Sequence, residues 1–193
     1  MSDKWIFFDC FGVILNDPFT RWDTDFNLTQ QQCKDLREKV FNPVDSGQIT
    51  TVQAMRRFAN IIQRPVGQFI EESWFSKTVV NEKLVDWIKQ NSDKYHIVLL
   101  SNAAPFYVDP LFERFGVHLI FEKLFISSDL HMAKPDPAIF RYALKECDCK
   151  PQNAIMIDDR AANIRGAKKA GMHGIVFHDT ESTIKRINEI FEN

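Results

Sequence analysis

The chain contains a small set of polar residues whose types, taken together, suit phosphoryl transfer. They are Asp9, Ser101, Asn102, Lys134, Asp158 and Asp159. A carboxylate can attack phosphorus and form an aspartyl phosphate. Further carboxylates can hold Mg²⁺ beside phosphate oxygens, while a lysine and a serine neutralise and hydrogen-bond the transferring group. For these residues to act together, the fold must bring them to one place.

Short apolar runs precede most of these residues. Each run has the length and the aromatic or branched content of a strand that is buried on both faces. The runs are 5–8, 97–100, 154–157, 174–177 and, with the weakest pattern, 124–126. In open α/β sheets, ligands bind at the carboxyl ends of the strands because loops and helix N-termini converge there. The polar residues are therefore expected to meet at one edge of a sheet.

Helical patterns alternate with these runs. Asp136 followed by Pro137 predicts the start of one helix. Residues 160–170 predict a second helix that Gly171 closes, and Thr180 is the expected cap of a C-terminal helix. Strands that alternate with helices predict an α/β fold, with a Rossmann-like parallel sheet sandwiched by helices.

Residues 17–80 break this alternation because they read as helical throughout. Thr29 and Gln32 have the spacing of a capping box, and a turn at 45–47 separates this helix from the next. The aromatic side chains of this segment are expected to form a small core of their own. The sequence thus predicts an α/β core of residues 1–16 and 81–193, with an inserted helical cap of residues 17–80.

Four segments, in this order and at these spacings, resemble the haloacid dehalogenase-like (HAD) hydrolases, which are mainly Mg²⁺-dependent phosphatases. Residues 8–13 (Phe-Asp-Cys-Phe-Gly-Val) are similar to the first family motif, normally D-x-D-G-[TV]. Leu-Ser-Asn at 100–102, Lys-Pro at 134–135 and Ile-Asp-Asp at 157–159 match the second, third and fourth. The Gly-Gln-Ile-Thr stretch at 47–50 resembles the subgroup that contains the epoxide-hydrolase N-terminal domain and glucose-1-phosphate phosphatases.

The resemblance implies a role for each matching residue. Asp9 would be the nucleophile and a metal ligand, and Lys134 would screen the charge between Asp9 and the phosphate. Ser101 would bind the phosphoryl group, and Asn102 would line the site. Asp158 and Asp159 would complete the Mg²⁺ site; on their own, these two acids would equally suit the start of a helix.

Phe11 departs from the family pattern. The family's second acid, which protonates the leaving alcohol and later activates water, belongs at this position, and a benzyl group can do neither. Loss of a positioned general acid typically costs a factor of about 10²–10⁴ in rate. The family's metal contact at this position is a backbone carbonyl, which Phe11 retains, and the Phe11 ring could form an aromatic wall for the substrate. His131, Asp17 and Asp25 are candidate replacements for the acid.

Three functions stay open at this point. The first is a Mg²⁺-dependent phosphatase for a small phosphate ester, including substrates whose leaving groups need little protonation. The second is a metal-free 2-haloacid dehalogenase, because those enzymes carry an aromatic residue at the position of Phe11 and halide needs no proton. The third is a catalytically impaired phosphate-binding or interaction module. Asp158 and Asp159 favour the metal, since three crowded carboxylates without a cation would be costly.

Composition excludes other classes. The net charge is −2, from 24 basic and 26 acidic residues among 193, so the chain has no basic field for nucleic acid or anionic lipid. No apolar run approaches the roughly 20 residues of a membrane span, and the N-terminal sequence has no signal-peptide pattern. The four cysteines fit neither a disulfide framework nor a zinc site, which predicts a reducing, cytoplasmic location. The sequence indicates neither the substrate nor the oligomeric state.

Overall fold

A parallel sheet of five strands forms the centre of the protein. The computed structural model describes residues 3–17, 21, 24 and 27–192. The strand order is β3-β2-β1-β4-β5, and every neighbouring pair is parallel. The strands are β1 (Trp5–Phe8), β2 (His96–Ser101), β3 (Lys123–Ile126), β4 (Ala154–Asp158) and β5 (His173–Val176). The predicted α/β class is therefore confirmed.

Alternate residues of each strand enter opposite halves of the core. Phe8 packs with Leu99 and Ile157 on one face of the sheet, while Phe7 packs with Leu100 and Met156 on the other. Side chains of successive strand residues point to opposite faces, so a strand covered on both sides must be apolar throughout. The continuous apolar runs of the sequence follow from this burial.

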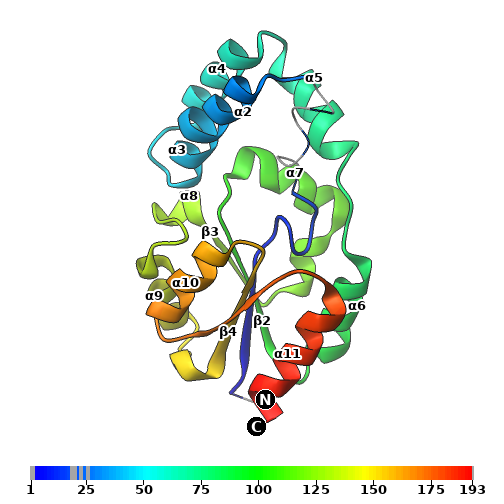
Figure 1. Ribbon diagram of the computed structural model, residues 1–193, viewed down its shortest axis with the longest axis vertical. Coiled ribbons are helices and arrows are strands. Elements are labelled where there is room, and N and C mark those ends of the chain that lie inside the picture. The colour runs from blue at the N-terminus through cyan, green and yellow to red at the C-terminus, as the bar shows by residue number, and fades with distance from the viewer. Residues whose placement is uncertain (1–2, 18–20, 22–23, 25–26, 193) are drawn as a thin grey trace.

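Helices cover both faces of the sheet (Figure 1). The face that contains Phe8 is covered by α6 (Glu82–Asn91), α7 (Pro105–Phe115) and α11 (Thr180–Glu192). The opposite face is covered by α9 (Pro137–Glu146) and α10 (Ala161–Lys169). Short helices η4 (Val117–Ile120), α8 (Ser127–Leu130) and η5 (Pro151–Asn153) lie in the connections.

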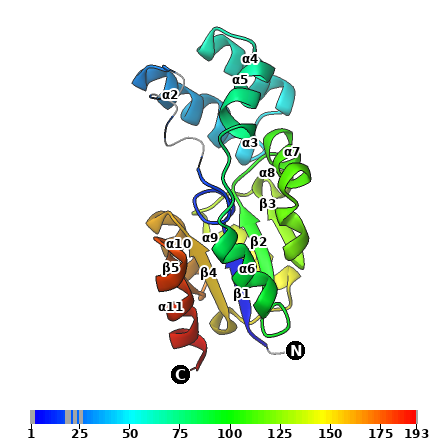
Figure 2. The same cartoon turned by 90° about the vertical axis from the view of Figure 1, so that its right-hand side faces the viewer.

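A second group of helices lies beyond the carboxyl ends of the strands (Figures 1 and 2). It contains α2 (Gln30–Leu36), η2 (Arg37–Phe41), α3 (Asn42–Asp45), α4 (Thr51–Ile62), α5 (Val66–Ile70) and η3 (Glu71–Phe75). We refer to these helices as the cap helices. The capping box of Thr29 and Gln32 is present, and Thr50 and Gln53 form a second one that starts α4.

The cap helices share one apolar core with the sheet. Phe58 packs its ring against Phe41 and Phe69, at centroid distances of 5.5 and 5.4 Å. The sequence predicted that these aromatic side chains form a core of their own. That prediction is wrong, because they belong to the same apolar cluster as the sheet residues. Phe41 also contacts the ring of Tyr107 on α7 at 5.9 Å, and Tyr107 belongs to the apolar cluster that covers the sheet.

The helix starts agree with the sequence except at the last helix. Asp136 accepts a hydrogen bond from the Ala138 amide and caps α9, as predicted. At α11 the cap is Asp179, whose side chain accepts from the Ser182 amide. Thr180 instead lies in the first turn and donates its hydroxyl to Asn81. In the part of the chain that the structure describes, no helix has the length and apolar character needed to cross a bilayer.

Candidate active site

The polar residues singled out from the sequence meet at the carboxyl edge of the sheet. Asp9 directly follows β1, while Ser101 and Asp158 are the last residues of β2 and β4. Since β1 lies between β2 and β4 in the sheet, these ends are neighbours. Lys134 reaches them from the loop between α8 and α9.

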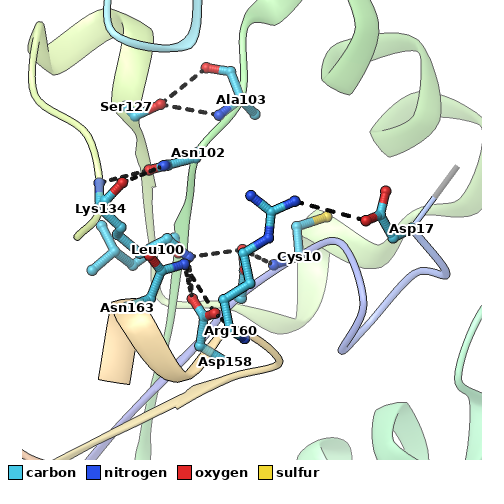
Figure 3. Close-up of polar contacts among 11 residues, drawn as sticks. Cys10, Asp17, Leu100, Asn102, Ala103, Ser127, Lys134, Asp158, Arg160 and Asn163 are labelled. Carbon is cyan, nitrogen blue, oxygen red and sulfur yellow. Dashed lines mark hydrogen bonds and ion pairs between the residues drawn. The ribbon is translucent and has the colours of Figure 1, made fainter. Parts of the chain in front are cut away.

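Lys134 is the central cation of the site (Figure 3). Its side chain is completely buried, with Nζ 2.9 Å from Asp9 Oδ1 and 2.7 Å from Asp158 Oδ2. It donates a third bond to the Leu100 carbonyl at 2.8 Å. Burial lowers the pKa of Lys134, but the two carboxylates outweigh this effect and raise it above the usual value. The ammonium group is therefore charged and fixed at the floor of the site.

Asp158 is held in place from the first turn of α10. Its Oδ1 accepts from the Arg160 amide at 2.8 Å, and Asn163 Nδ2 lies 2.9 Å from both carboxylate oxygens. Burial raises the pKa of Asp158, but Lys134 and these donors lower it further, so the net shift is downward. These contacts favour the ionised form of Asp158, which orients Lys134.

Three carboxylates surround the space next to Lys134. Asp9, Asp158 and Asp159 each offer one oxygen, and these oxygens lie within 4.8 Å of one another. With Lys134, the group carries a formal charge of −2 when all three acids are ionised. Burial followed by the charge of Asp158 raises the pKa of Asp159, and burial likewise raises the pKa of Asp9 despite Lys134. The single positive charge of Lys134 therefore does not balance the three carboxylates.

The cluster fits a small divalent cation. Asp159 Oδ1 is buried and has no hydrogen-bond partner, which leaves it available as a ligand. Carboxylate oxygens are the donors that Mg²⁺ prefers, and two positive charges would balance the cluster. Gly12 makes room for this arrangement: its φ is +80°, and a Cβ there would lie 2.7 Å from Asp159 Oδ2.

The second motif contributes a clamp and a buried hydroxyl. Asn102 Nδ2 donates to the Lys134 carbonyl, and the Lys134 amide donates to Asn102 Oδ1, both at 2.8 Å. This pair of bonds fixes the loop that carries the lysine. Ser101 is fully buried and its Oγ has no hydrogen-bond partner. Ser101 is not among the residues that line the cavity.

A cavity of about 570 Å³ opens above this floor. Its lining includes Asp9, Phe11, Asn102 and Lys134, together with Asp17, Arg160 and Asn163. The cap helices supply Arg37, Phe41, Asn42 and Asp45. The cavity is large enough for a small metabolite, and most of its side chains are polar.

Phe11 lies where the family pattern has an acid. The residue is half-buried, lines the cavity, and packs its ring on Tyr107 at 5.9 Å. Of the candidate replacements, Asp17 lines the cavity and pairs with Arg160 at 3.8 Å. His131 is exposed and lies against Gly47 rather than on the cavity wall. Asp25 lies outside the described residues.

Sequence reasoning missed two groups of site residues. Asn163 could have been found, because five residues after Asp158 is one turn into the helix that follows the strand. The cap residues Arg37, Asn42 and Asp45 could not, because only the packing of the cap brings them to the cavity.

The parallel sheet, the lysine between two carboxylates and the third acid define a hydrolase of the HAD type. A family model described as haloacid dehalogenase-like hydrolase matches residues 4–171. The chain belongs to this family.

Individual relatives agree with this assignment. The chain is 26% identical to D-ribitol-5-phosphate phosphatase from Bacteroides thetaiotaomicron over 140 residues, which is 68% of either chain. It is 30% identical to bifunctional epoxide hydrolase 2 from Mus musculus over 70 residues, 36% of this chain and 13% of that one. The chain spans less than a third of the length of several curated relatives it matches.

The fold has a counterpart among solved structures. The HAD family enzyme bt-2542 from Bacteroides thetaiotaomicron, in its magnesium complex, superposes with a TM-score of 0.81 at 23% identity. The superposition covers 95% of this chain and 98% of that enzyme. At this identity the likeness concerns the fold.

Proposed function

We propose that the protein is a Mg²⁺-dependent phosphatase that hydrolyses a small phosphorylated metabolite through an aspartyl phosphate on Asp9. The observation that carries this proposal is the placement of Asp9 at the floor of the cavity, between Lys134 and a carboxylate cluster that needs a divalent cation. The phosphatase names of relatives and the magnesium complex of a structural counterpart support it.

Each residue of the floor has a role in this reaction. Asp9 would attack phosphorus with the carboxylate oxygen that Lys134 does not hold, since Oδ1 already accepts from Lys134 and from the Cys10 amide at 2.7 Å. Lys134 neutralises charge between the nucleophile and the phosphate. Asp9, Asp158, Asp159 and the Phe11 carbonyl would hold Mg²⁺, which, when bound, draws electron density from the phosphate oxygens.

The second motif, residues 100–102, would bind the phosphoryl group of the substrate. Ser101 and Asn102 are the proposed phosphate-binding residues: Asn102 lines the cavity, and the buried Ser101 hydroxyl has no other hydrogen-bond partner. The Phe11 ring forms part of the wall against which the rest of the substrate packs.

The cap helices would complete the site around a small substrate. We propose that residues 17–80 form a cap on a core of residues 1–16 and 81–193, and that the two crossings of the chain between them allow the cavity to open and close. The four free cysteines fit a reducing, cytoplasmic environment.

The absence of an acid at position 11 should affect one step of the reaction and not the others. Phosphate and metal binding should persist, while protonation of a poor leaving group by residue 11 is lost. If no other residue donates that proton, Phe11→Asp should therefore raise the rate on alkyl phosphates, whose leaving group needs a proton, within the factor of roughly 10²–10⁴ that a general acid supplies. If another residue does, the gain should be smaller. The substitution should leave aryl phosphates, which have good leaving groups, nearly unchanged.

The experiment is a panel of alkyl, acyl, sugar and aryl phosphates, assayed for phosphate release with Mg²⁺ and with EDTA, with Asp9→Asn as the inactive control. Release that requires both Mg²⁺ and Asp9 supports the proposal. Turnover of a 2-haloacid that EDTA does not affect would show a dehalogenase instead. Mg²⁺ binding without turnover of any substrate would show an impaired binding module.

A further inference from the structure

One acid of the cap helices lies on the wall of the cavity. Asp45 is the last residue of α3 and lines the same cavity as Asp9. Its Oδ1 accepts a hydrogen bond from the Tyr107 hydroxyl at 2.6 Å, and its backbone carbonyl accepts from Ser127. Tyr107 lies on α7, which covers the sheet, and Ser127 is the first residue of α8, directly after β3. The carboxyl group of Asp45 is therefore fixed relative to the floor of the site.

The turn that carries Asp45 is fitted closely to the core. Gly47 has a φ of +67°, and a Cβ at this residue would lie 2.2 Å from His131 Nδ1. A larger residue would force the turn away from the loop after α8. The close contact at Gly47 and the two hydrogen bonds of Asp45 together determine where the carboxyl lies.

Asp45 is connected to the position where the family acid is missing. The ring of Phe11 packs on Tyr107 at 5.9 Å, and the hydroxyl of the same tyrosine holds Asp45. A phenylalanine at position 11 supplies one of the ring contacts that hold Tyr107, beside those of Phe41 and Phe106, and an aspartate there could not. The loss of one carboxyl and the placement of another are thus linked through a single side chain.

We propose that Asp45 is the general acid and base of this enzyme, in place of residue 11. The inference rests on the proposed phosphatase function, which it deepens. It assigns the proton transfer to the cap, so the reaction depends on the cap lying over the substrate.

The step can be written with its bonds and protons. An oxygen of Asp9 forms a bond to phosphorus while the bond to the leaving oxygen breaks, and that oxygen keeps the electron pair and takes the proton of Asp45. Asp45, now a carboxylate, then accepts a proton from water as the water oxygen attacks phosphorus. The bond to Asp9 breaks, inorganic phosphate leaves, and both acids return to their starting states.

The surroundings of Asp45 suit a group that must both give and accept a proton. Burial raises its pKa to about 7, although the Tyr107 hydroxyl and the charge of Arg160 lower it. The other charged groups on the cavity wall are Asp9 and Lys134, Arg37 on the preceding helix, and Asp17, which pairs with Arg160. A catalytic acid is most effective when its pKa lies near the working pH.

The test is Asp45→Asn, which keeps the shape of the side chain and an oxygen that can accept from Tyr107. The rates at which the leaving alcohol and p-nitrophenol are released in the first turnover are compared for an alkyl phosphate and p-nitrophenyl phosphate, with Mg²⁺ present. The first turnover isolates proton donation to the leaving group from the later attack of water, which Asp45 would assist for both substrates alike. We expect a loss of about 10²-fold or more on the alkyl phosphate and little change on the aryl phosphate, whose leaving group needs no proton. Glu38→Gln, an exposed cap acid outside the cavity, is the matched control and should change neither rate.

Two further measurements separate catalysis from a structural role. Adding Phe11→Asp to the Asp45→Asn variant should restore part of the alkyl phosphate rate. In the wild type, the alkyl phosphate rate should fall above about pH 7, because a deprotonated Asp45 cannot donate, while the aryl phosphate rate should not. This pH profile tests the proposal even if the variant fails to fold.

The outcomes are distinguishable. An equal loss of first-turnover release on both substrates in Asp45→Asn, or the same pH profile for both in the wild type, would overturn this inference while leaving the phosphatase intact. A wild-type protein that releases phosphate from neither substrate would overturn the proposed function, and this inference with it.

Discussion

Replacing Lys134 by methionine should destabilise the protein strongly. The ammonium group is completely buried and is the cation that Asp9 and Asp158 share, at 2.9 and 2.7 Å. Its removal leaves two carboxylates facing each other in a buried place. Breaking a buried ion pair by removing one partner costs about 3–5 kcal/mol. For a chain of this size, that loss lowers the Tm by roughly 6–20 °C, at about 2–4 °C per kcal/mol.

The destabilisation of Lys134→Met should grow with pH. Without the lysine, burial raises the folded-state pKa of Asp9 and Asp158 above the unfolded value, so the folded protein binds more protons. Stability is then fully present below the unfolded pKa and falls as the pH rises through the folded one. The variant should therefore approach the wild type at acid pH and fall furthest below it at neutral and alkaline pH.

Urea unfolding at several pH values, in EDTA so that a cation cannot compensate, measures this effect. Lys169→Met, at an exposed lysine of α10, is the control and should change stability by less than about 0.5 kcal/mol. Adding Asp158→Asn to Lys134→Met should recover part of the loss, because one unpaired charge is removed. If Lys134→Met unfolds like the control at every pH, the view of Lys134 as the shared counter-ion is wrong.

Two other predictions concern the metal site. Mg²⁺ at 100 times its Kd should stabilise the wild type by about 2.7 kcal/mol and raise its Tm, while Asp159→Asn should lose most of this gain; equal gains in a thermal melt would exclude Asp159 as a ligand. Gly12→Ala should cost about 1–2 kcal/mol for its positive φ and weaken Mg²⁺ binding by displacing Asp159. Gly67→Ala, where a Cβ meets nothing within 4 Å, should not weaken binding, and if both glycine variants bind Mg²⁺ alike, the proposed fit of Gly12 against Asp159 fails.

The parts of the fold that local patterns determine could be predicted from the sequence. The apolar runs gave the strands, because parallel strands covered on both faces must be apolar throughout. The capping box at Thr29 and the start of α9 at Asp136 followed from side chains that satisfy free amides. At α11, two neighbouring residues could both cap, and the hydrogen bond of Thr180 to Asn81, far away in the sequence, left that role to Asp179.

The site residues at the ends of the strands could be predicted from the sequence, and those that the cap helices supply could not. Asp9 and Asp158 end neighbouring strands, so the topology alone brings them together. Asp45 reaches the cavity only because the turn at Gly47 packs against the core and Tyr107 holds the carboxyl. In the sequence, Asp45 reads only as the first residue of a turn, since no local pattern records a contact across 62 residues.

The most direct test of the whole account is whether Asp9 becomes phosphorylated. The enzyme is mixed with an excess of a phosphate ester that it hydrolyses, quenched during turnover and treated with borohydride, which reduces an aspartyl phosphate to homoserine. Mass spectrometry of the peptide that contains residue 9 should then find homoserine at that position, dependent on both substrate and Mg²⁺. An unmodified aspartate during steady turnover, or homoserine at another residue, would contradict the account.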